Sequence, residues 1–361
     1  MNRIVLIGNG FDLAHDLKTS YKDFIEGYWQ YRFNKFGKEQ SYISKDCLCT
    51  FERLDKNPWY LFRQDVLSKP FNKVTGKQAI DYIINDKNKY KVTFSPLFER
   101  IYNSIETKGW VDIENEYYNL LTEYAFEESA KEKLARLNGQ LLVLKDSLIE
   151  YLKNIKNDVT AFDCIKEKIY APINTREISV GAPFYFAGTV PIERIMLLSF
   201  NYTSTAEKYK LKKTDSGGIS CTVNYIHGKI NDSRTVIFGY GDELDTKFKE
   251  LQNLNDNECL KNVKTIRYLE SDNYRNVLTF MESAPYQVCI MGHSCGNSDR
   301  TLLNTLFEHK NCVSIKPYYY RKEDGFDNYI ELVQNISRNF TDMKLMRNRV
   351  VNKQYCEFLT G

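Results

Sequence analysis

"RIVLIGNGFDLAHDLKTSY" spans residues 3–21 and predicts a buried strand, a glycine turn and the start of a helix. The apolar run at 3–7 is short and ends at a glycine, as buried strands often do. Beyond the Gly8-Asn9-Gly10 turn, apolar residues recur at helical spacing. Leu13 stands where a dinucleotide-binding fingerprint would place its third glycine. The stretch therefore predicts a nucleotide-binding fold without the usual fingerprint.

The composition is that of an ordinary globular protein without a dominant charge. The 361 residues can bury a large core without a disulfide or metal staple. Apolar residues make up 42% of the chain and charged residues 27%. The chain has 50 basic and 47 acidic side chains, which gives a net charge of +3. Nucleic acid is therefore not an expected ligand, although a basic tail runs from Arg338 to Lys353.

Cysteine usage and hydropathy indicate the compartment. The nine cysteines show no framework spacing, and the C-x-C of Cys47 and Cys49 has no second pair that would complete a zinc site. No bound metal is therefore expected. The run at 5–7 is too short for a signal peptide, and no run approaches the ~18 apolar residues of a membrane span. We expect a reduced, cytoplasmic, soluble protein that does not bind a membrane.

Strand and helix patterns divide the chain into two parts. Strand-like runs occur at 3–7, 194–200, 222–226, 235–238, 287–291 and 312–317. Helical stretches separate some of these runs, at 203–210 and 300–309. The long interval between the first two runs is helical in pattern, most clearly at 128–156, and residues 30–95 predict helices joined by polar loops.

Strands that alternate with helices predict an α/β fold with a parallel, Rossmann-like sheet. Because one strand lies near residue 5 and the others follow residue 190, the helical block is interpreted as an insertion. The sequence thus predicts a nucleotide-binding domain at 1–25 plus 190–361 and a large, mainly helical insertion domain at 26–189.

Small and polar residues follow five predicted strands. In an open α/β sheet, ligands bind at the carboxyl edge of the strands, so these ends together predict a ligand site. The five ends are Gly8-Asn9-Gly10-Phe11-Asp12, 199–203, 227–231, 239–243 and 292–299.

The first of these ends suits a nucleotide. Gly8 and Gly10 allow backbone amides to approach a phosphate at a helix start. Asp12 would repel a pyrophosphate, so we expect its carboxylate to hold a ribose hydroxyl. Capping of the helix by Asp12 or Asn9 is the alternative.

Three side chains at the other ends are candidates for chemistry. His227 follows a strand and precedes Gly228, which suits general acid–base catalysis near neutral pH. Asn201 can orient a water or a sugar hydroxyl, or it can cap the following helix. Asp299 begins a helix, either as a site residue or as a simple N-cap.

Two other kinds of enzyme fit parts of the sequence. The run Gly292-His293-Ser294-Cys295-Gly296 matches the G-x-S-x-G pattern of serine hydrolases, but the only later histidine, His309, lies in the helix that leads away from Ser294. A metal-dependent nuclease would use Asp112, Glu114 and Asp242. On a helix the first two of these acids point to different faces.

Six motifs, in this order, resemble the AbiH family of bacterial phage-abortive-infection proteins. The resemblance covers both ends of the α/β part and one point in the helical block. It implies an antiphage effector. The motifs are IVLIGNGFDLAHDLKTSY (4–21), WVDIE (110–114), LSFNYTSTAE (198–207), YIHGKIND (225–232), IFGYGDE (237–243) and MGHSCGNSDRTLLN (291–304).

That family is in turn similar to the sirtuin-like domains of antiphage effectors. The similarity implies that Gly8 and Gly10 touch the nucleotide, that Asn201 positions ribose and water, and that His227 is the catalytic histidine. Ser294 and Asp299 would line the far side of the cofactor. The other expected cofactor contacts are Asn9, Phe11, Asp12, Gly228, Gly292 and His293.

The chain departs from the sirtuin-like pattern at several points. The turn reads Gly-Asn-Gly-Phe-Asp where that pattern has Gly-Ala-Gly-(Ile/Leu)-Ser, and Thr203 stands where such effectors often carry an acid. The four-cysteine zinc module of protein deacylases is absent from the sequence, so protein deacylation is not expected.

The resemblance therefore implies an effector that takes NAD⁺ as its substrate and hydrolyses the nicotinamide–ribose bond. Asn201 would align a water, and His227 would accept a proton. The alternative is a non-catalytic nucleotide sensor whose helical insertion recognises a phage-derived trigger or partner protein. An effector that stays silent until infection also favours a homo-oligomer.

Overall fold

The computed structural model describes residues 1–68, 74–108, 112–156, 158–184, 188–322 and 325–360. The chain folds into two compact units: unit 1 comprises residues 1–17, 155–255 and 262–361, and unit 2 comprises residues 18–154 and 256–261. Unit 2 is thus inserted into unit 1 between Leu17 and Ile155. Residues 18–25 belong to the inserted unit and residues 155–189 to unit 1, whereas the sequence placed these boundaries at 25 and 190.

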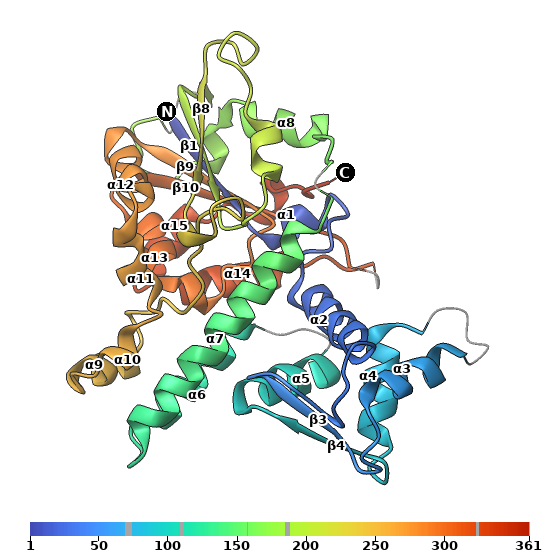
Figure 1. Ribbon diagram of the computed structural model, residues 1–361. Helices are drawn as coiled ribbons and strands as arrows, with labels where there is room; N and C mark the ends of the chain where they lie inside the picture. The colour runs from blue at the N-terminus through green and yellow to red at the C-terminus, as the bar shows by residue number, and fades with distance from the viewer. Residues whose placement is uncertain (69–73, 109–111, 157, 185–187, 323–324, 361) are drawn as a thin grey trace. The chain divides into compact units, whose positions relative to one another are not determined.

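Unit 1 is built on a parallel sheet (Figure 1), which confirms the α/β, Rossmann-like fold predicted from the sequence. The strand order is β10-β9-β1-β7-β8, and β1 pairs in register with β7 on one side and β9 on the other. The strands are β1 (Asn2–Ile7), β7 (Arg194–Ser199), β8 (Ser220–Tyr225), β9 (Tyr286–Met291) and β10 (Cys312–Tyr318).

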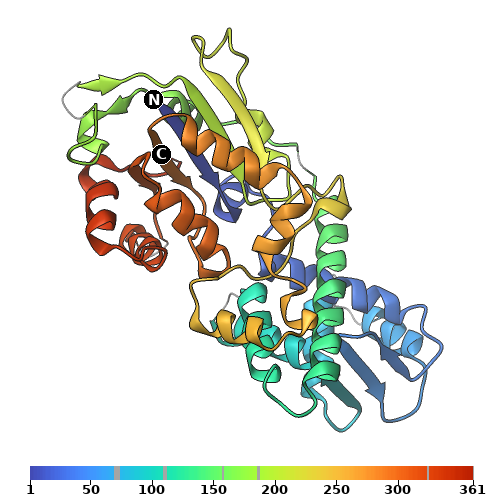
Figure 2. The same cartoon turned by 90° about the vertical axis from the view of Figure 1, so that its left-hand side faces the viewer.

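Side chains of β1 alternate between two cores. Ile4 and Leu6 pack in the core that includes helices α12 (Asn273–Ser283) and α13 (Arg300–Glu308). Val5 and Ile7 pack in the core that includes α8 (Asp163–Tyr170). Figure 2 shows α12 in front of the sheet. Because both faces are covered, every residue of the strand is buried, which explains its continuous apolar run.

The predicted strand at 235–238 is wrong. A 3₁₀ turn, η3 (Ser233–Thr235), comes first, and the Ile237 amide then donates to the carbonyl of His227 at 2.9 Å. Ile237 lies in the core shared with α12 and α13. The apolar run is therefore buried as a loop, and burial without strand pairing produces the same pattern in the sequence.

The remaining elements of unit 1 are short, and the longest of them is α14 with 10 residues. The predicted helix at 203–210 is the 3₁₀ helix η2 (Thr205–Tyr209). The others are α1 (Asn9–Leu13), β5 (Ile173–Asn174), η1 (Thr175–Glu177), β6 (Thr189–Val190), α9 (Thr246–Asn253), α11 (Lys264–Arg267), η4 (Tyr268–Glu270), η5 (Asn297–Asp299), α14 (Tyr329–Arg338), α15 (Met343–Arg349) and η6 (Lys353–Tyr355).

Unit 2 combines helices with a small antiparallel sheet that the sequence did not predict. Its helices are α2 (Tyr21–Phe36), α3 (Trp59–Ser68), α4 (Gly76–Asn85), α5 (Pro96–Lys108), α6 (Ile113–Tyr124), α7 (Ala130–Lys153) and α10 (Asn257–Leu260). Its strands are β2 (Ile43–Lys45), β3 (Cys49–Arg53) and β4 (Tyr90–Phe94). The long helix predicted at 128–156 is confirmed as α7. Within the described residues, no helix combines the length and apolar character that a membrane crossing requires.

Candidate functional site

The central strand β1 marks the point where the strand order reverses across the sheet. In such sheets, ligands bind outside the carboxyl ends of the strands that flank this point, here β1 and β9. The loops after these strands touch each other, because the Gly10 amide donates to the Gly292 carbonyl at 2.8 Å. A Cβ atom added at Gly8 would stand 2.5 Å from the Cα of His293. Gly8 and Gly10 thus allow two loops to pack, and the Gly10 amide that was expected to face a phosphate is already bonded.

Asn201, after β7, fastens the β1 turn. Its side-chain amide donates to the Gly8 carbonyl at 2.9 Å, and its own backbone is held by the hydroxyl of Ser199. The side chain is buried. Asn201 therefore orders the ends of β1 and β7, and the water-aligning role expected from the sequence stays a prediction.

His227 follows β8 and is fixed by its neighbour in the chain. Gly228 has φ of +80°, and a Cβ atom there would stand 2.1 Å from the carbonyl oxygen of Thr235. Only glycine lets the 235–237 segment pass this closely. Close packing thus explains why a glycine follows His227. The same contact fixes the backbone next to His227.

The imidazole of His227 faces a buried carboxylate. Its Nε2 atom lies 3.2 Å from Oδ1 of Asp299, and the same oxygen accepts a hydrogen bond from the Lys264 ammonium at 2.8 Å. All three side chains are buried, and Lys264 is completely inaccessible to solvent. Asp299 stands at the N-cap position of α13, but its side chain makes no capping hydrogen bond and pairs with these two partners.

Charge and burial fix the protonation states of this cluster. Burial lowers the pKa of His227, the Lys264 ammonium lowers it further, and Asp299 opposes both effects. Burial raises the pKa of Asp299, but Lys264 and His227 together outweigh it and hold that pKa well below its usual range. Near neutral pH the cluster therefore holds a neutral imidazole beside an ionised carboxylate.

Aromatic rings surround the His227 imidazole. The centre of the Phe200 ring lies 5.3 Å away, edge to face, and the Tyr268 ring is nearly parallel to the imidazole with its centre at 6.2 Å. The hydroxyl of Tyr268 is 3.3 Å from His227 Nε2. Phe200 also contacts the ring of His293 at 4.1 Å. These contacts restrict the orientation of the imidazole.

His293 joins the cluster from the loop after β9. Its Nδ1 atom accepts a hydrogen bond from the Cys295 amide at 3.0 Å, so a neutral ring carries its proton on Nε2. That nitrogen lies 3.7 Å from Oδ2 of Asp299. The two oxygens of Asp299 thus face different histidines.

The serine-hydrolase motif lacks the geometry of a nucleophile elbow. Ser294 is exposed, and the left-handed φ of +55° falls on the buried Cys295, whereas an elbow places the nucleophile itself on the strained turn. His309, the histidine that a triad would need, lies 3.0 Å from Glu282 and accepts the amide of Asn311. Both of its ring nitrogens are therefore occupied elsewhere.

Asp12 follows β1 in the short helix α1, and its side chain is buried. Its Oδ2 atom accepts a hydrogen bond from the Thr203 hydroxyl at 2.6 Å. Burial raises the pKa of Asp12, and the nearby side chains of Thr203, Thr205 and Asn201 oppose that rise. Thr203, which stands where the sirtuin-like pattern carries an acid, thus holds an acid supplied by the β1 turn.

The other residues of the β1 turn cap helix α1, are exposed or pack in the core. Gly8 is the N-cap of α1, so neither Asn9 nor Asp12 caps this helix. Asn9 is exposed, and Phe11 is fully buried against Tyr209, with the ring centres 5.0 Å apart. Phe11 therefore belongs to the core that includes α8, and not to a ligand surface.

The acids of the nuclease hypothesis bond other partners. Asp112 caps α6 by accepting the Asn115 amide, and Asp242 pairs with Arg300 at 3.2 Å. Trp110 and Val111 of the WVDIE motif lie outside the described residues. Within the part of the chain that the structure describes, no group of three or more His, Cys, Asp or Glu side chains could hold a metal ion.

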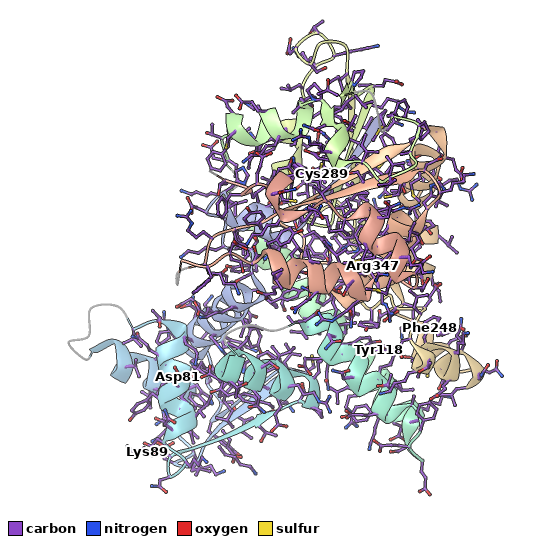
Figure 3. The ribbon with its side chains drawn as sticks, turned by 180° about the vertical axis from the view of Figure 1, so that it is seen from behind. Asp81, Lys89, Tyr118, Phe248, Cys289 and Arg347 are labelled. Carbon is purple, nitrogen blue, oxygen red and sulfur yellow. The ribbon has the colours of Figure 1, made fainter. Side chains whose placement is uncertain are left out.

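Only some of the basic side chains between Arg338 and Lys353 are exposed. Arg347, labelled on α15 in Figure 3, is exposed, but Arg349 is buried and donates to the carbonyl of Phe307. Lys353 forms an ion pair with Asp327 at 2.7 Å. The charge run is thus divided between packing and solvent.

Sequence reasoning missed Lys264 and Tyr268. They stand four residues apart in the α11–η4 segment, and both are buried against His227 or Asp299. A lysine in a short helix is ordinarily exposed, so no pattern singled it out. A buried lysine near a buried aspartate can be recognised only when the fold brings them together.

The chain is similar to a family of known proteins. A family described as "Bacteriophage abortive infection AbiH" matches residues 4–320. This span includes all the residues of the His227 cluster and of the Asp12 turn. No curated protein matches the chain.

Proposed function

The chain belongs to the AbiH family of bacteriophage abortive infection proteins, and we propose that it acts in that role by hydrolysing NAD⁺ at the nicotinamide–ribose bond. The observation that carries the proposal is the buried His227–Asp299–Lys264 cluster at the carboxyl edge of a Rossmann-like sheet. Buried charged groups are costly to a fold unless they are paired, and they gather where chemistry needs shifted pKa values.

His227 has the properties of a general base. Its Nε2 atom faces the ionised carboxylate of Asp299, so the proton of the neutral ring resides there and Nδ1 carries the lone pair. Burial and Lys264 lower the pKa of His227, which keeps the ring neutral near pH 7. An aspartate that orients a histidine in this way also stabilises the imidazolium that forms when the base accepts a proton.

The reaction breaks one bond to the ribose and forms another. The C1′–N bond breaks with its electron pair going to nicotinamide, which leaves as a neutral molecule, and the ribose gains oxocarbenium character. A water oxygen then bonds to C1′ and gives its proton to His227. The products are nicotinamide, ADP-ribose and a proton, and general-base help of this kind contributes roughly 10²–10⁴-fold in rate.

The neighbouring residues act through His227. Lys264 holds Asp299 ionised, and Tyr268 and Phe200 restrict the imidazole plane. Because its amide nitrogen donates to Gly8, we assign Asn201 a positioning role in this mechanism, in which it fixes the β1 turn beside the site. Gly292 and His293 act in the same way, as the loop that packs against that turn.

The test is direct. The purified full chain is incubated with NAD⁺, and the products are identified by mass. We expect nicotinamide and ADP-ribose from the native chain and a loss of at least about 100-fold in rate for His227→Ala. His309→Gln is the matched control, because His309 pairs with Glu282 away from the cluster. Full turnover by His227→Ala would contradict the mechanism.

Two further outcomes decide between functions. Calorimetric binding of NAD⁺ without any product over hours would replace the hydrolase with a nucleotide sensor. Product formation that appears only when a phage lysate is added would support the phage-derived trigger expected of an effector, and it would leave the role of His227 open to the same variant test.

A further inference from the structure

A short segment, residues 237–242, forms main-chain hydrogen bonds at or beside each of the three residues His227, Lys264 and Asp299. It belongs to the IFGYGDE motif. At its start, the Ile237 amide donates to the carbonyl of His227 at 2.9 Å. The start of the segment is thus held by the residue that carries the imidazole.

The middle of the segment holds the main chain at Lys264. The Tyr240 amide donates to the carbonyl of Asn262 at 3.1 Å, and the Tyr240 carbonyl accepts the Lys264 amide at 2.9 Å. A Cβ atom at Gly239 would stand 1.9 Å from the same Asn262 carbonyl oxygen. Glycine therefore permits this close approach of two backbones, and the approach fixes the point from which the Lys264 side chain extends.

The end of the segment bonds the loop that carries Asp299. The Gly241 amide donates to the carbonyl of Ser298 at 3.1 Å, and the Gly241 carbonyl accepts the Thr301 amide at 3.3 Å. A Cβ atom at Gly241 would stand 3.2 Å from Cβ of Lys264 and 3.4 Å from the Ser298 carbonyl oxygen. Gly241 therefore packs against both the lysine and the loop of the aspartate.

An ion pair joins the residues that directly follow Gly241 and Asp299. The Arg300 guanidinium donates to Oδ2 of Asp242 at 3.2 Å, and the other oxygen of Asp242 accepts the Leu244 amide at 3.0 Å. Asp242 is only 3% exposed. Burial raises the pKa of Asp242, and the charge and hydrogen bond of Arg300 oppose that rise. The buried carboxylate thus depends on Arg300 to stay ionised.

A buried ion pair stabilises a fold little more than apolar residues would, but its directional bonds can fix one arrangement of the chain. We propose that Asp242 and Arg300 are positioning residues, whose ion pair locks segment 237–242 against the lysine and the aspartate of the His227 cluster. Both act through the main chain that the ion pair fixes. This role goes beyond the proposed hydrolysis of NAD⁺ and does not depend on the substrate.

The pKa of His227 reports the geometry of the cluster. Burial lowers this pKa, Lys264 and His293 lower it further, and Asp299 raises it, and together these effects lower it. Loosening of the cluster therefore returns the pKa upward, toward its ordinary value. Removal of the Asp242 charge alone would lower the pKa, because a nearby anion stabilises the imidazolium. The direction of the shift thus separates a lost geometry from a lost charge.

The experiment follows the His227 imidazole of the full chain by histidine ¹³C NMR in a pH titration. We expect the pKa to rise by about 1 pH unit in Asp242→Asn, a shift comparable to the ordinary spread of histidine pKa values in proteins. The same rise is expected when Arg300→Gln is added, and there the net charge of the pair is unchanged. Glu243→Gln is the matched control, because it removes a negative charge from the exposed neighbouring residue. It should leave the pKa unchanged.

A second measurement keeps the test valid if Asp242→Asn does not fold. Hydrogen-exchange mass spectrometry of peptides that cover residues 262–268 shows whether Tyr240 still holds this stretch. Arg300 is partly exposed, so Arg300→Gln is the milder change. We expect exchange to increase about tenfold in Arg300→Gln, the effect of losing a hydrogen bond to a charged group, and to stay constant in Glu243→Gln. Thermal unfolding confirms that each variant is folded.

The outcomes separate this role from the proposed function. An unchanged or lowered pKa of His227 in folded Asp242→Asn, or unchanged exchange of residues 262–268 in Arg300→Gln, would overturn the positioning role. Either result would leave NAD⁺ hydrolysis untouched, because His227→Ala tests it separately. Conversely, a raised pKa and faster exchange in a protein whose native chain does not cleave NAD⁺ would support the positioning role and overturn the hydrolase.

Discussion

Burial and three neighbouring side chains act on the protonation of His227. Burial, which is the largest effect, lowers the pKa of His227, Lys264 and His293 lower it further, and Asp299 raises it through its charge and a hydrogen bond. Removal of Lys264 must therefore raise the pKa of His227, and removal of the Asp299 charge must lower it further. The two substitutions act in opposite directions on one atom, which makes them a sensitive test of the cluster.

We expect the imidazole of His227 to titrate at higher pH in Lys264→Met and at lower pH in Asp299→Asn than in the native chain. Histidine ¹³C NMR measures both, and the chain has four histidines to resolve. If catalysis uses the neutral ring, the acid limb of NAD⁺ cleavage should move in the same directions. Shifts of equal sign in both variants would show that the carboxylate and the ammonium do not act on this ring.

Some residues of the site could be predicted from their position after a strand. The rule that ligands bind at the carboxyl ends of parallel strands selected His227, Asn201 and Asp299, and the structure brings His227 and Asp299 within 3.2 Å. The rule does not identify the hydrogen-bond partner of each side chain. The sequence predicted that Asn201 would align a water, and in the structure its side chain donates a hydrogen bond to the Gly8 carbonyl. Lys264 lies outside every predicted strand end, and its burial depends on tertiary contacts alone.

At the scale of elements, the G-x-S-x-G run has a packing role. Gly292 has φ of +74°, and a Cβ atom there would stand 2.0 Å from the Phe11 amide nitrogen. Gly296, four residues later, has φ of −69°, and its Cβ would meet only the Ser294 hydroxyl, at 3.6 Å. One motif thus holds a glycine that the fold requires and a glycine that it does not.

We expect Gly292→Ala to lower the free energy of unfolding by roughly 2–4 kcal/mol, because it combines a left-handed backbone with a backbone collision. Gly296→Ala should change the free energy by less than about 1 kcal/mol. Urea denaturation of the two variants provides the comparison. Equal losses would mean that the β1 and β9 loops do not pack as closely as 2.8 Å between Gly10 and Gly292 implies.

Elements were predictable where burial covered a whole strand. The runs at 3–7, 194–200 and 287–291 are buried on both faces, and their apolar continuity predicts strands correctly. The run at 235–238 has the same composition but packs as a loop. In unit 2, β3 alternates between buried and half-buried residues that include Glu52 and Arg53. Because these residues are polar, the sequence pattern did not predict a strand there.

At the scale of the whole molecule, the chain interrupts the sheet unit twice. The long insertion carries most of unit 2, and residues 256–261 make a second, short excursion, after which unit 1 resumes at Asn262, two residues before Lys264. Within unit 2, a side chain of α7 bonds this excursion. The amide of Asn138 donates to the carbonyl and to the carboxylate of Glu258, and its own oxygen accepts from Tyr117.

We therefore expect Asn138→Ala to loosen the 256–261 segment without unfolding unit 2. The loss of hydrogen bonds to a charged partner should cost about 1–3 kcal/mol of local stability, which increases amide exchange there by about 5–150-fold. Hydrogen-exchange mass spectrometry of peptides from this segment measures the effect. Asn154→Ala is the control, because Asn154 is exposed and bonds only within its own helix end, to Glu150. Unchanged protection of residues 256–261 in Asn138→Ala would mean that apolar contacts, such as those of the buried Cys259, hold this segment. The hydrogen bonds between Asn138 and Glu258 would then contribute little to its stability.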